Sequence, residues 1–235
     1  RNLLLNGHLD TVGVTGMDQP FEPRVENGRL YGRGAFDMKA SLAACLMTLV
    51  TAKSLGLKGD VAFTAVADEE DGSIGTEETL AELGRNGRRF AAAVVLEPSE
   101  LELQVAHRGF AVLDVDLTGK ASHTAKPEAG VNALTHLGRL LAAVERVAGQ
   151  LTEASPHALL RHGSLQPVLA SGGQELYTTP ARATVALERR TLPGEGHALA
   201  LAEVNAILAR LQAEDPTFSS QVTTRIAREP FEVPV

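Results

Sequence analysis

The segment VAFTAVADEEDGSIGT, residues 61–76, decides the fold. Its first seven residues are almost continuously apolar, which is typical of a parallel strand covered on both faces. Four acidic residues follow at once, Asp68 to Asp71, and we expect residues 76–83 to form a short helix. A buried strand followed by an acidic turn and a helix is typical of an α/β layer, in which ligands bind at the carboxyl ends of the strands.

The sequence on both sides continues this alternation of strand and helix. Residues 2–5 and 91–96 are further apolar runs that predict buried strands. Residues 38–55 predict a helix because apolar side chains recur there at helical spacing: Met38, Leu42, Leu46, Leu49 and Val50. The order strand, helix, strand, helix, strand predicts an α/β domain over residues 1–107.

The pattern changes near residue 108. Residues 112–117 alternate apolar and acidic side chains, as in an antiparallel strand with one wet face. The further expected elements are helices over 132–148 and around 204–211, and strands over 164–170, 182–189 and 219–226. The order β-α-β-β-α-β predicts a ferredoxin-like α+β domain over residues 108–228. We expect residues 229–235 to return to the first domain.

Composition excludes several classes of function. A formal net charge of −7 gives no basic footprint for nucleic acid. No apolar run reaches the roughly 18 residues of a membrane span. The single cysteine, Cys45, excludes an internal disulfide framework, permits a reducing compartment and is expected in the core of its helix. We expect a cytoplasmic protein with a small-molecule partner and neither nucleic acid nor membrane as partner.

The chain ends suggest a longer protein. Residue 1 leads directly into an apolar run without an initiator methionine, and the sequence stops at FEVPV without a closing element. We therefore expect the chain to be the central part of a longer protein.

Acidic residues and one histidine follow the predicted strands of the first domain, except for Asp37, which follows a glycine-rich turn and opens the predicted helix. They are His8, Asp10, Asp37, Glu69, Glu70 and Glu97. Because the carboxyl ends of parallel strands share one edge of a sheet, we expect these side chains to meet there. Crowded carboxylates are costly unless a cation neutralises them, and Asp, Glu and His suit zinc, manganese or cobalt. The pattern predicts a two-metal site with a neighbouring glutamate as general base.

Six motifs occur in the order and with the spacing of one hydrolase family. They are GHLDTV (7–12), YGRGAFDMKAS (31–41), DEEDGSIGT (68–76), LEPSE (96–100), GKASHTAKPEAGVNAL (119–134) and ERRTLPGE (188–195). The chain resembles the M20 family of metallopeptidases and deacylases, which includes glutamate carboxypeptidase, aminoacylase, acetylornithine deacetylase and succinyl-diaminopimelate desuccinylase. The resemblance implies a zinc-exopeptidase-like α/β catalytic domain with an inserted ferredoxin-like α+β lid and dimerisation domain.

The resemblance also implies a metal site. His8 and Glu97 would bind one ion, Glu70 would bind the other, and Asp37 would bridge the two. Asp10 would orient His8 from behind. The implied cofactor is Zn2+, two per subunit, with Co2+ or Mn2+ also suited to these ligands.

Three further residues acquire roles from the resemblance. Glu69 would be the general base that takes a proton from a metal-activated water. His123 would reach into the active site of the partner subunit of a homodimer and stabilise the oxyanion. Arg190 would hold the substrate's carboxylate, where bidentate geometry favours arginine over lysine. The implied reaction is cleavage of an amide or peptide bond of an N-acyl amino acid or a C-terminal amino acid.

Two departures from the family pattern leave alternatives open. The family's last metal ligand is a histidine that follows a glycine-rich segment near the C-terminus, and this chain has no such segment. We expect that ligand to lie outside the chain. Tyr177 stands where the family usually has an asparagine that contacts substrate. A non-catalytic, dimerising or ligand-binding protein is therefore one alternative, and a di- or tripeptide aminopeptidase, which Glu97 disfavours, is another.

Each candidate residue also has a structural explanation. Asp37 could cap the helix over residues 38–55, and the acidic run 68–71 could be a solvated turn. The remaining candidates could be turn, loop or surface ion-pair residues: His8, Glu97, His123 and Arg190.

Overall fold

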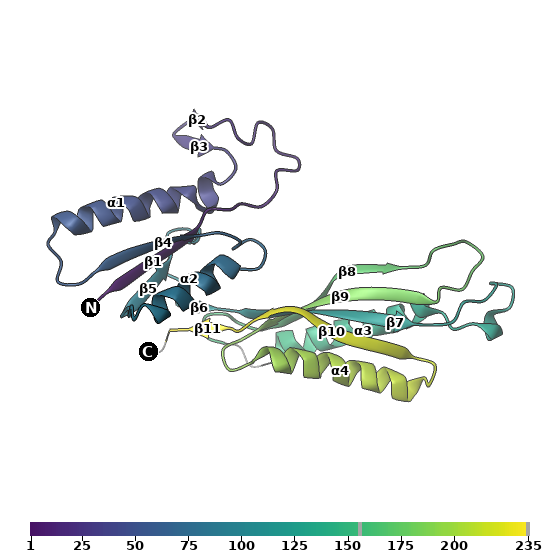
Figure 1. The fold of residues 1–235 in the computed structure, drawn as a ribbon. Helices are drawn as coiled ribbons and strands as arrows, with labels where there is room; N and C mark the ends of the chain where they lie inside the picture. Colours follow the sequence, from purple (N-terminus) through teal and green to yellow (C-terminus); the bar gives the residue numbers. More distant parts are fainter. Residues whose placement is uncertain (155–156, 234–235) are drawn as a thin grey trace. The chain divides into compact units, whose positions relative to one another are not determined.

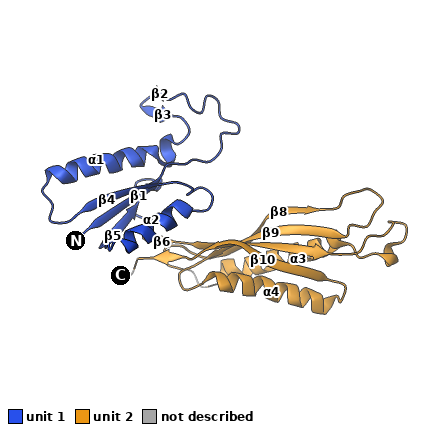
Figure 2. Cartoon of the chain, in the orientation of Figure 1, with its two compact units in different colours: residues 1–103 blue, residues 104–235 orange. Residues whose placement is uncertain are grey.

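The computed structural model describes residues 1–154 and 157–233. Its contacts divide the chain into two compact units, Arg1–Leu103 and Gln104–Val235 (Figure 2). The division lies slightly before the boundary that the sequence predicted after residue 107.

The segment predicted to return to the first domain contains one short strand. β11 (Phe231–Glu232) pairs antiparallel with β6 (Ala106–His107), and both strands belong to the second unit. The last two residues of the predicted segment, 234 and 235, lie outside the described residues.

A three-stranded parallel sheet forms the centre of the first unit (Figure 1). β1 (Leu3–His8) lies between β4 (Val61–Val66) and β5 (Ala92–Val95). Residue 8 pairs with residue 66, and residue 6 pairs with residue 95, so the three strands end at one edge. The helices of this unit are α1 (Ala40–Ser54), entered through a helical turn η1 (Ala35–Lys39), and α2 (Ile74–Arg85). The predicted α/β class is confirmed.

The buried face of α1 differs from the predicted one. Leu42 and Cys45 are buried, which confirms that the cysteine is a core residue. Leu46 and Val50, predicted on the same inner face, are 56% and 63% exposed. Within α1, only Leu42 and Cys45 are buried, so the apolar face of this helix is covered over a narrower width than predicted.

The strands of the first unit are also less covered than predicted. β4 is mostly half-buried and β5 is exposed along its length, although both were expected to be buried on two faces. The physical reason is that β4 and β5 are both edge strands of this sheet, and that α1 packs on β4 and β1 and α2 on β4, whereas β5 has no comparable helix contact among the described residues.

The segment Ala35–Ser54 is long and apolar enough, by length and composition alone, to cross a membrane. One such segment is weak evidence for a membrane span, because core helices and signal sequences pass the same test; only 17% of this segment is buried, and α1 contacts β4 and β1.

A small hairpin precedes α1 and was not predicted. β2 (Arg24–Glu26) pairs with β3 (Arg29–Tyr31), and the two residues between them, Asn27 and Gly28, have φ values of 51° and 75°. Asn-Gly is the preferred pair for a two-residue hairpin loop because both positions need positive φ.

The main elements of the second unit have the predicted order β-α-β-β-α-β (Figure 1). They are β7 (Gly109–Thr118), α3 (Ala133–Glu153), β8 (Ser164–Gly172), β9 (Arg182–Thr191), α4 (His197–Glu214) and β10 (Ser219–Arg228). The strands form one antiparallel sheet in the order β10-β7-β9-β8. The topology is ferredoxin-like.

One continuous hydrophobic core joins this sheet to its two helices. Every second residue of β7 is buried, among them Leu113, Val115 and Leu117, whereas the acidic residues between them face the other side. Leu140 of α3 and Val204 of α4 are fully buried against this face. The alternation seen in the sequence thus corresponds to one covered and one wet face.

The start of α3 depends on a side-chain cap, which gives a first prediction. The Asn132 side chain accepts hydrogen bonds from the backbone N–H groups of Leu134, at 2.9 Å, and Thr135, at 3.2 Å. We expect Asn132→Ala to lower the free energy of unfolding by about 1 kcal/mol, because two N–H groups lose their acceptor. Urea unfolding followed by circular dichroism measures the change. The matched control, Asn132→Ser, keeps an acceptor and should lose much less; equal losses for both variants would contradict the capping role.

Candidate metal centre

The candidate ligands of the first unit come together at the carboxyl edge of its sheet. His8 is the last residue of β1, and Glu69 and Glu70 lie in the turn that follows β4. Glu97 lies just after β5, and Asp37 lies in the turn η1. Four separate segments of the chain therefore contribute to one cluster, as the positions of the strand ends require.

A close contact between β1 and η1 brings Asp37 to this edge. Met38 is fully buried, and its Sδ accepts a hydrogen bond from the backbone N–H of His8 at 3.1 Å. A Cβ atom at Gly7 would lie 2.6 Å from Met38 Cε, so any larger residue would require the end of the Met38 side chain to shift. Sequence reasoning missed this pair, although a glycine inside a strand was a usable signal of a close approach.

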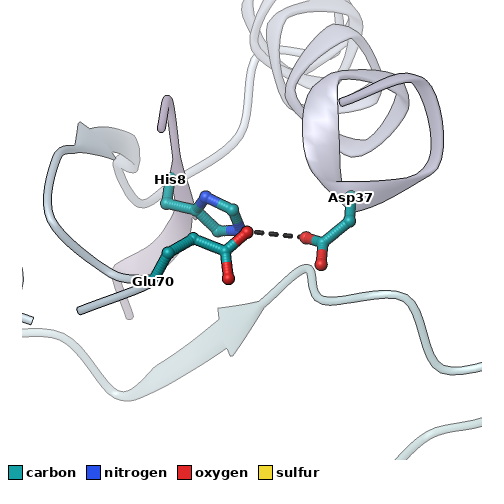
Figure 3. A group of neighbouring side chains, drawn as sticks. All are labelled: His8, Asp37 and Glu70. Atoms are coloured by element: carbon teal, nitrogen blue, oxygen red, sulfur yellow. Dashed lines mark hydrogen bonds and ion pairs between the residues drawn. The ribbon is translucent and has the colours of Figure 1, made fainter. Parts of the chain in front are cut away.

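A backbone carbonyl places a hydrogen on Nδ1 of the His8 ring. Nδ1 lies 2.9 Å from the backbone carbonyl oxygen of Asp10. A carbonyl oxygen can only accept, so Nδ1 carries the hydrogen and donates it. Nε2 then points at Asp37 Oδ1, 3.0 Å away, as Figure 3 shows. A histidine whose Nδ1–H is held by a carbonyl presents Nε2 as its ligand atom.

Several carboxylates surround this Nε2 atom. Glu97 Oε2 lies 3.7 Å from it and Glu69 Oε2 lies 3.9 Å from it. Two overlapping groups have potential ligand atoms within 4.8 Å of one another: His8 with Asp37 and Glu70 (Figure 3), and His8 with Glu69 and Glu97. His8 is buried and the acids are partly exposed, so the cluster is accessible from solvent.

Two glutamates of this cluster, Glu69 and Glu97, have raised pKa values and are therefore harder to ionise than free glutamates. Burial raises the pKa of Glu97, and the negative charge of Glu69 raises it further. Burial likewise raises the pKa of Glu69, with neighbouring negative charges adding to the effect and the charge of His8 opposing it. Burial acts to lower the pKa of His8, but its hydrogen bond to Asp37 and the nearby carboxylates raise it overall. The cluster therefore carries an excess of negative charge that a cation would relieve.

Asp10 supports the cluster from behind. Its Oδ2 accepts a hydrogen bond from the backbone N–H of Glu70 at 3.1 Å, and its Oδ1 is buried without a hydrogen bond among the described residues. Burial acts to raise the pKa of Asp10, but backbone hydrogen bonds, first from Glu70, lower it overall. Its carboxylate lies 3.6 Å from His8 Nδ1, so its carbonyl makes the closer contact with the ring.

Two of the structural explanations can be compared with the geometry. The residue at the cap position of α1 is Lys39, and the Asp37 carboxylate contacts His8 instead of the first N–H groups of the helix, so the structure does not support the suggestion that Asp37 caps it. Asp68 does have a structural role, because its Oδ2 accepts from the N–H of Ile74 at the start of α2. The acidic run thus contains one residue that holds the turn, Asp68, two that face the cluster, Glu69 and Glu70, and the exposed Asp71.

His123 lies in the second unit, on the exposed segment between β7 and α3. Its Nδ1 accepts a hydrogen bond from the backbone N–H of Ala125 at 3.1 Å. In the neutral ring the hydrogen is therefore on Nε2, which remains free to donate. This is the tautomer that can stabilise negative charge on an oxygen.

Arg190 also lies in the second unit, on the wet face of β9. It is half-exposed, pairs with Glu188 at 2.6 Å, and places its guanidinium over the ring of Phe110 at 5.2 Å. The preceding Arg189 is fully buried on the opposite face and pairs with Glu203 at 2.7 Å. Of the two adjacent arginines, only Arg190 can reach a ligand.

The comparisons with known proteins identify a family. Residues 4–223 match the profile of peptidase family M20/M25/M40. Succinyl-diaminopimelate desuccinylase of Beijerinckia indica is 34% identical over 194 residues, which cover 77% of this chain and 50% of the relative. Acetylornithine deacetylase of Myxococcus xanthus is 28% identical over 228 residues, which cover 94% of this chain and 57% of the relative. The chain thus spans about half the length of these relatives.

The fold recurs in solved structures. A tripeptidase of Staphylococcus aureus superposes with a TM-score of 0.78 at 22% identity, over 99% of this chain and 60% of that one. At this identity the likeness concerns the fold. The family profile, by contrast, covers almost the whole sequence from the first strand to β10. The chain belongs to peptidase family M20/M25/M40.

Proposed function

We propose that the protein is a metal-dependent hydrolase that cleaves an amide or peptide bond of an N-acyl amino acid or a C-terminal amino acid. The observation that carries this proposal is the gathering of His8, Asp37 and three glutamates at one sheet edge in a member of this family. The names of the relatives, a desuccinylase and a deacetylase, describe removal of acyl groups by those proteins. A non-catalytic role has no comparable support.

The metal ligands in this proposal are His8, Asp37, Glu70 and Glu97. Their nitrogen and carboxylate oxygen atoms suit zinc, two ions per subunit, with cobalt or manganese as substitutes. When bound, such ions polarise a carbonyl oxygen and increase the acidity of a water molecule. Asp10 keeps the Nδ1 hydrogen of His8 in place through its carbonyl oxygen and holds the Glu70 turn through its carboxylate.

Glu69 is the general base of this proposal. Its raised pKa brings it closer to neutrality, where a carboxylate removes a proton from water more effectively. It belongs to the cluster without being needed to hold the turn, which Asp68 does. The proton that Glu69 accepts then passes to the leaving nitrogen.

The second unit acts as a lid and dimerisation domain inserted into the catalytic domain. His123 donates its Nε2 hydrogen to the developing oxyanion in the active site of the partner subunit, which needs a homodimer. Arg190 receives the carboxylate of the substrate, and its stacking on Phe110 holds the guanidinium plane in place.

The metal-free cluster gives a prediction about stability. Because the pKa of Glu97 is raised in the folded protein, its contribution favours folding below its usual pKa and is lost as pH rises through the raised value. We therefore expect metal-free Glu97→Gln to unfold at a higher temperature than the wild type at about pH 7.5, with a smaller difference at about pH 4. Thermal unfolding in a chelator measures this.

Zinc should reverse the order, because ligand binding stabilises the wild type more than a variant that lacks one ligand. Glu22→Gln, which removes an exposed carboxylate outside the cluster, is the control and should show neither effect. A metal-free wild type that is more stable than Glu97→Gln near neutral pH would contradict the proposed charge crowding.

Removing the general base should separate catalysis from metal binding. We expect Glu69→Gln to lower kcat of the full-length protein by about 10²–10⁴-fold, because the attacking water keeps its proton. Metal content, measured by atomic emission, should stay at the wild-type level. Asp71→Asn, which changes an exposed acid in the same turn, should keep its activity. Full activity of Glu69→Gln would overturn the mechanism.

Mixing two inactive variants tests the partner role of His123. Each homodimer of Glu69→Gln or of His123→Ala should be nearly inactive. In a mixed dimer, the subunit with an intact Glu69 meets an intact His123 from its partner. An equal mixture after subunit exchange should therefore recover about a quarter of wild-type activity, since half of the dimers have one complete site. No recovery, with exchange verified by mass spectrometry, would place His123 in its own subunit's site.

A further inference from the structure

A cavity of about 610 Å³ lies at the amino edge of the first unit's sheet, where the strands begin. Its lining includes Asn2, just before β1, and Val61, the first residue of β4. The last turn of α1 contributes Lys53, and the last turn of α2 contributes Leu83. The candidate metal centre lies at the opposite edge of the same sheet. The two are separated by the length of β1, which is roughly 20 Å for its 6 residues.

Hydrogen bonds from Asn2 hold the base of this amino-edge cavity together. Its side-chain amide donates to the carbonyl oxygen of Arg89 at 3.1 Å, and its side-chain oxygen accepts from the N–H of Asp60 at 3.0 Å. Its own carbonyl oxygen accepts from the N–H of Ala91 at 2.8 Å. One residue thus joins the start of β1 to the loops that precede β4 and β5, so the cavity has a well-defined base.

Apolar side chains form part of the cavity wall. Leu49, Leu83 and Phe90 line it and are half-buried. Leu57 lines it from the loop after α1 and is 52% exposed. Sites for small ligands commonly have volumes of about 300–1,000 Å³ and combine apolar walls with a few polar groups. The amino-edge cavity therefore suits a ligand with an apolar body.

Two cationic side chains also line the cavity. The Arg88 guanidinium lies 3.4 Å from the carboxylate of Asp60, another lining residue. Lys53 has no hydrogen bond or ion pair within the part of the chain that the structure describes, so its charge is not neutralised there. The segments that supply most of the lining, 49–62 and 83–90, contain five lysines and arginines and one acid, in a chain whose net charge is −7. A local excess of positive charge in an acidic protein favours an anionic ligand.

We propose that the amino-edge cavity binds a small organic carboxylate with an aromatic or alkyl body. The carboxylate would contact the Lys53 ammonium and the Arg88 guanidinium, which form charge-assisted hydrogen bonds to such groups. The apolar body would contact Leu57 and Phe90 and leave water. The proposal does not rest on the proposed function, because the cavity and the metal centre share no residue.

Binding of 4-phenylbutyrate to the full-length protein tests this proposal. The protein is freed of metal with a chelator and dialysed, so that isothermal titration calorimetry measures affinity without any need for activity. Two further probes separate the contributions to binding. 4-Phenylbutanol has a similar apolar body without the charge, and inorganic phosphate has charge without the apolar body. Hydrogen exchange locates the site, with protection expected in residues 55–60 and 86–91.

A double variant, Lys53→Gln with Arg88→Gln, removes both cationic groups of the lining. The matched control, Arg29→Gln with Arg146→Gln, removes the same charge from exposed positions outside the cavity. We expect the first variant to bind 4-phenylbutyrate about tenfold more weakly than the wild type, because the charge-assisted hydrogen bonds are lost. The control should change the affinity less than about twofold, since distant exposed charges are screened by salt.

Four results would overturn the inference. They are no binding of 4-phenylbutyrate to the wild type, equal affinity for 4-phenylbutanol or for phosphate, equal weakening in the double variant and its control, and protection confined to the second unit. Weaker binding only in the variant that lacks Lys53 and Arg88, with protection beside the cavity, would support it. None of these results involves amide hydrolysis, so the failure of this inference would leave the proposed function intact.

Discussion

The parallel pairing of β1 with both β4 and β5 is the constraint on which the candidate site depends. β1 is the central strand, so its last residue, His8, is almost fully buried while the turns after its neighbours stay accessible. The register places Val66 beside His8 and ends β5 at the level of Asn6. Asn6 strengthens this alignment, because its side-chain amide donates to the Thr64 hydroxyl at 2.9 Å. A shift of either neighbour would move the glutamates away from the His8 ring.

The same alignment creates an electrostatic conflict. It brings carboxylates together around one imidazole, and burial and mutual repulsion raise the pKa of Glu69 and Glu97. Apolar residues at these positions, or a larger separation between the acids, would give a more stable fold. This chain instead supports the arrangement with a glycine that admits Met38 and with the hydrogen bond from the Glu70 backbone to Asp10. Carboxylates that are held together despite their mutual repulsion are typical of a site that functions with a bound cation.

The sequence predicted the helices and strands that show a regular apolar pattern. It did not predict which of their apolar side chains another element would cover. The strands of both units and the convergence of the acids on one sheet edge follow from apolar runs and from strand direction. The exposure of Leu46 and Val50 did not follow, because periodicity shows that a helix has an apolar face but not how much of it is covered. The carbonyl of Asp10 was missed because backbone acceptors leave no trace in residue identity. The β2–β3 hairpin was not predicted, although the pair Asn27-Gly28 is a sequence signal for a two-residue hairpin loop.

Register also assigns the roles of the two adjacent arginines in β9. Successive side chains of a strand point to opposite faces, so Arg189 and Arg190 cannot share an environment. β7 places Ala111 opposite Arg189 and Phe110 opposite Arg190. Arg189, opposite the small Ala111, lies in the core, where Glu195 and Glu203 neutralise its charge. Arg190 stacks on the ring of Phe110. A slip of one residue would bury Arg190 and expose the structural arginine. The arginine available to a ligand is therefore selected by strand pairing, just as pairing selects the acids around His8.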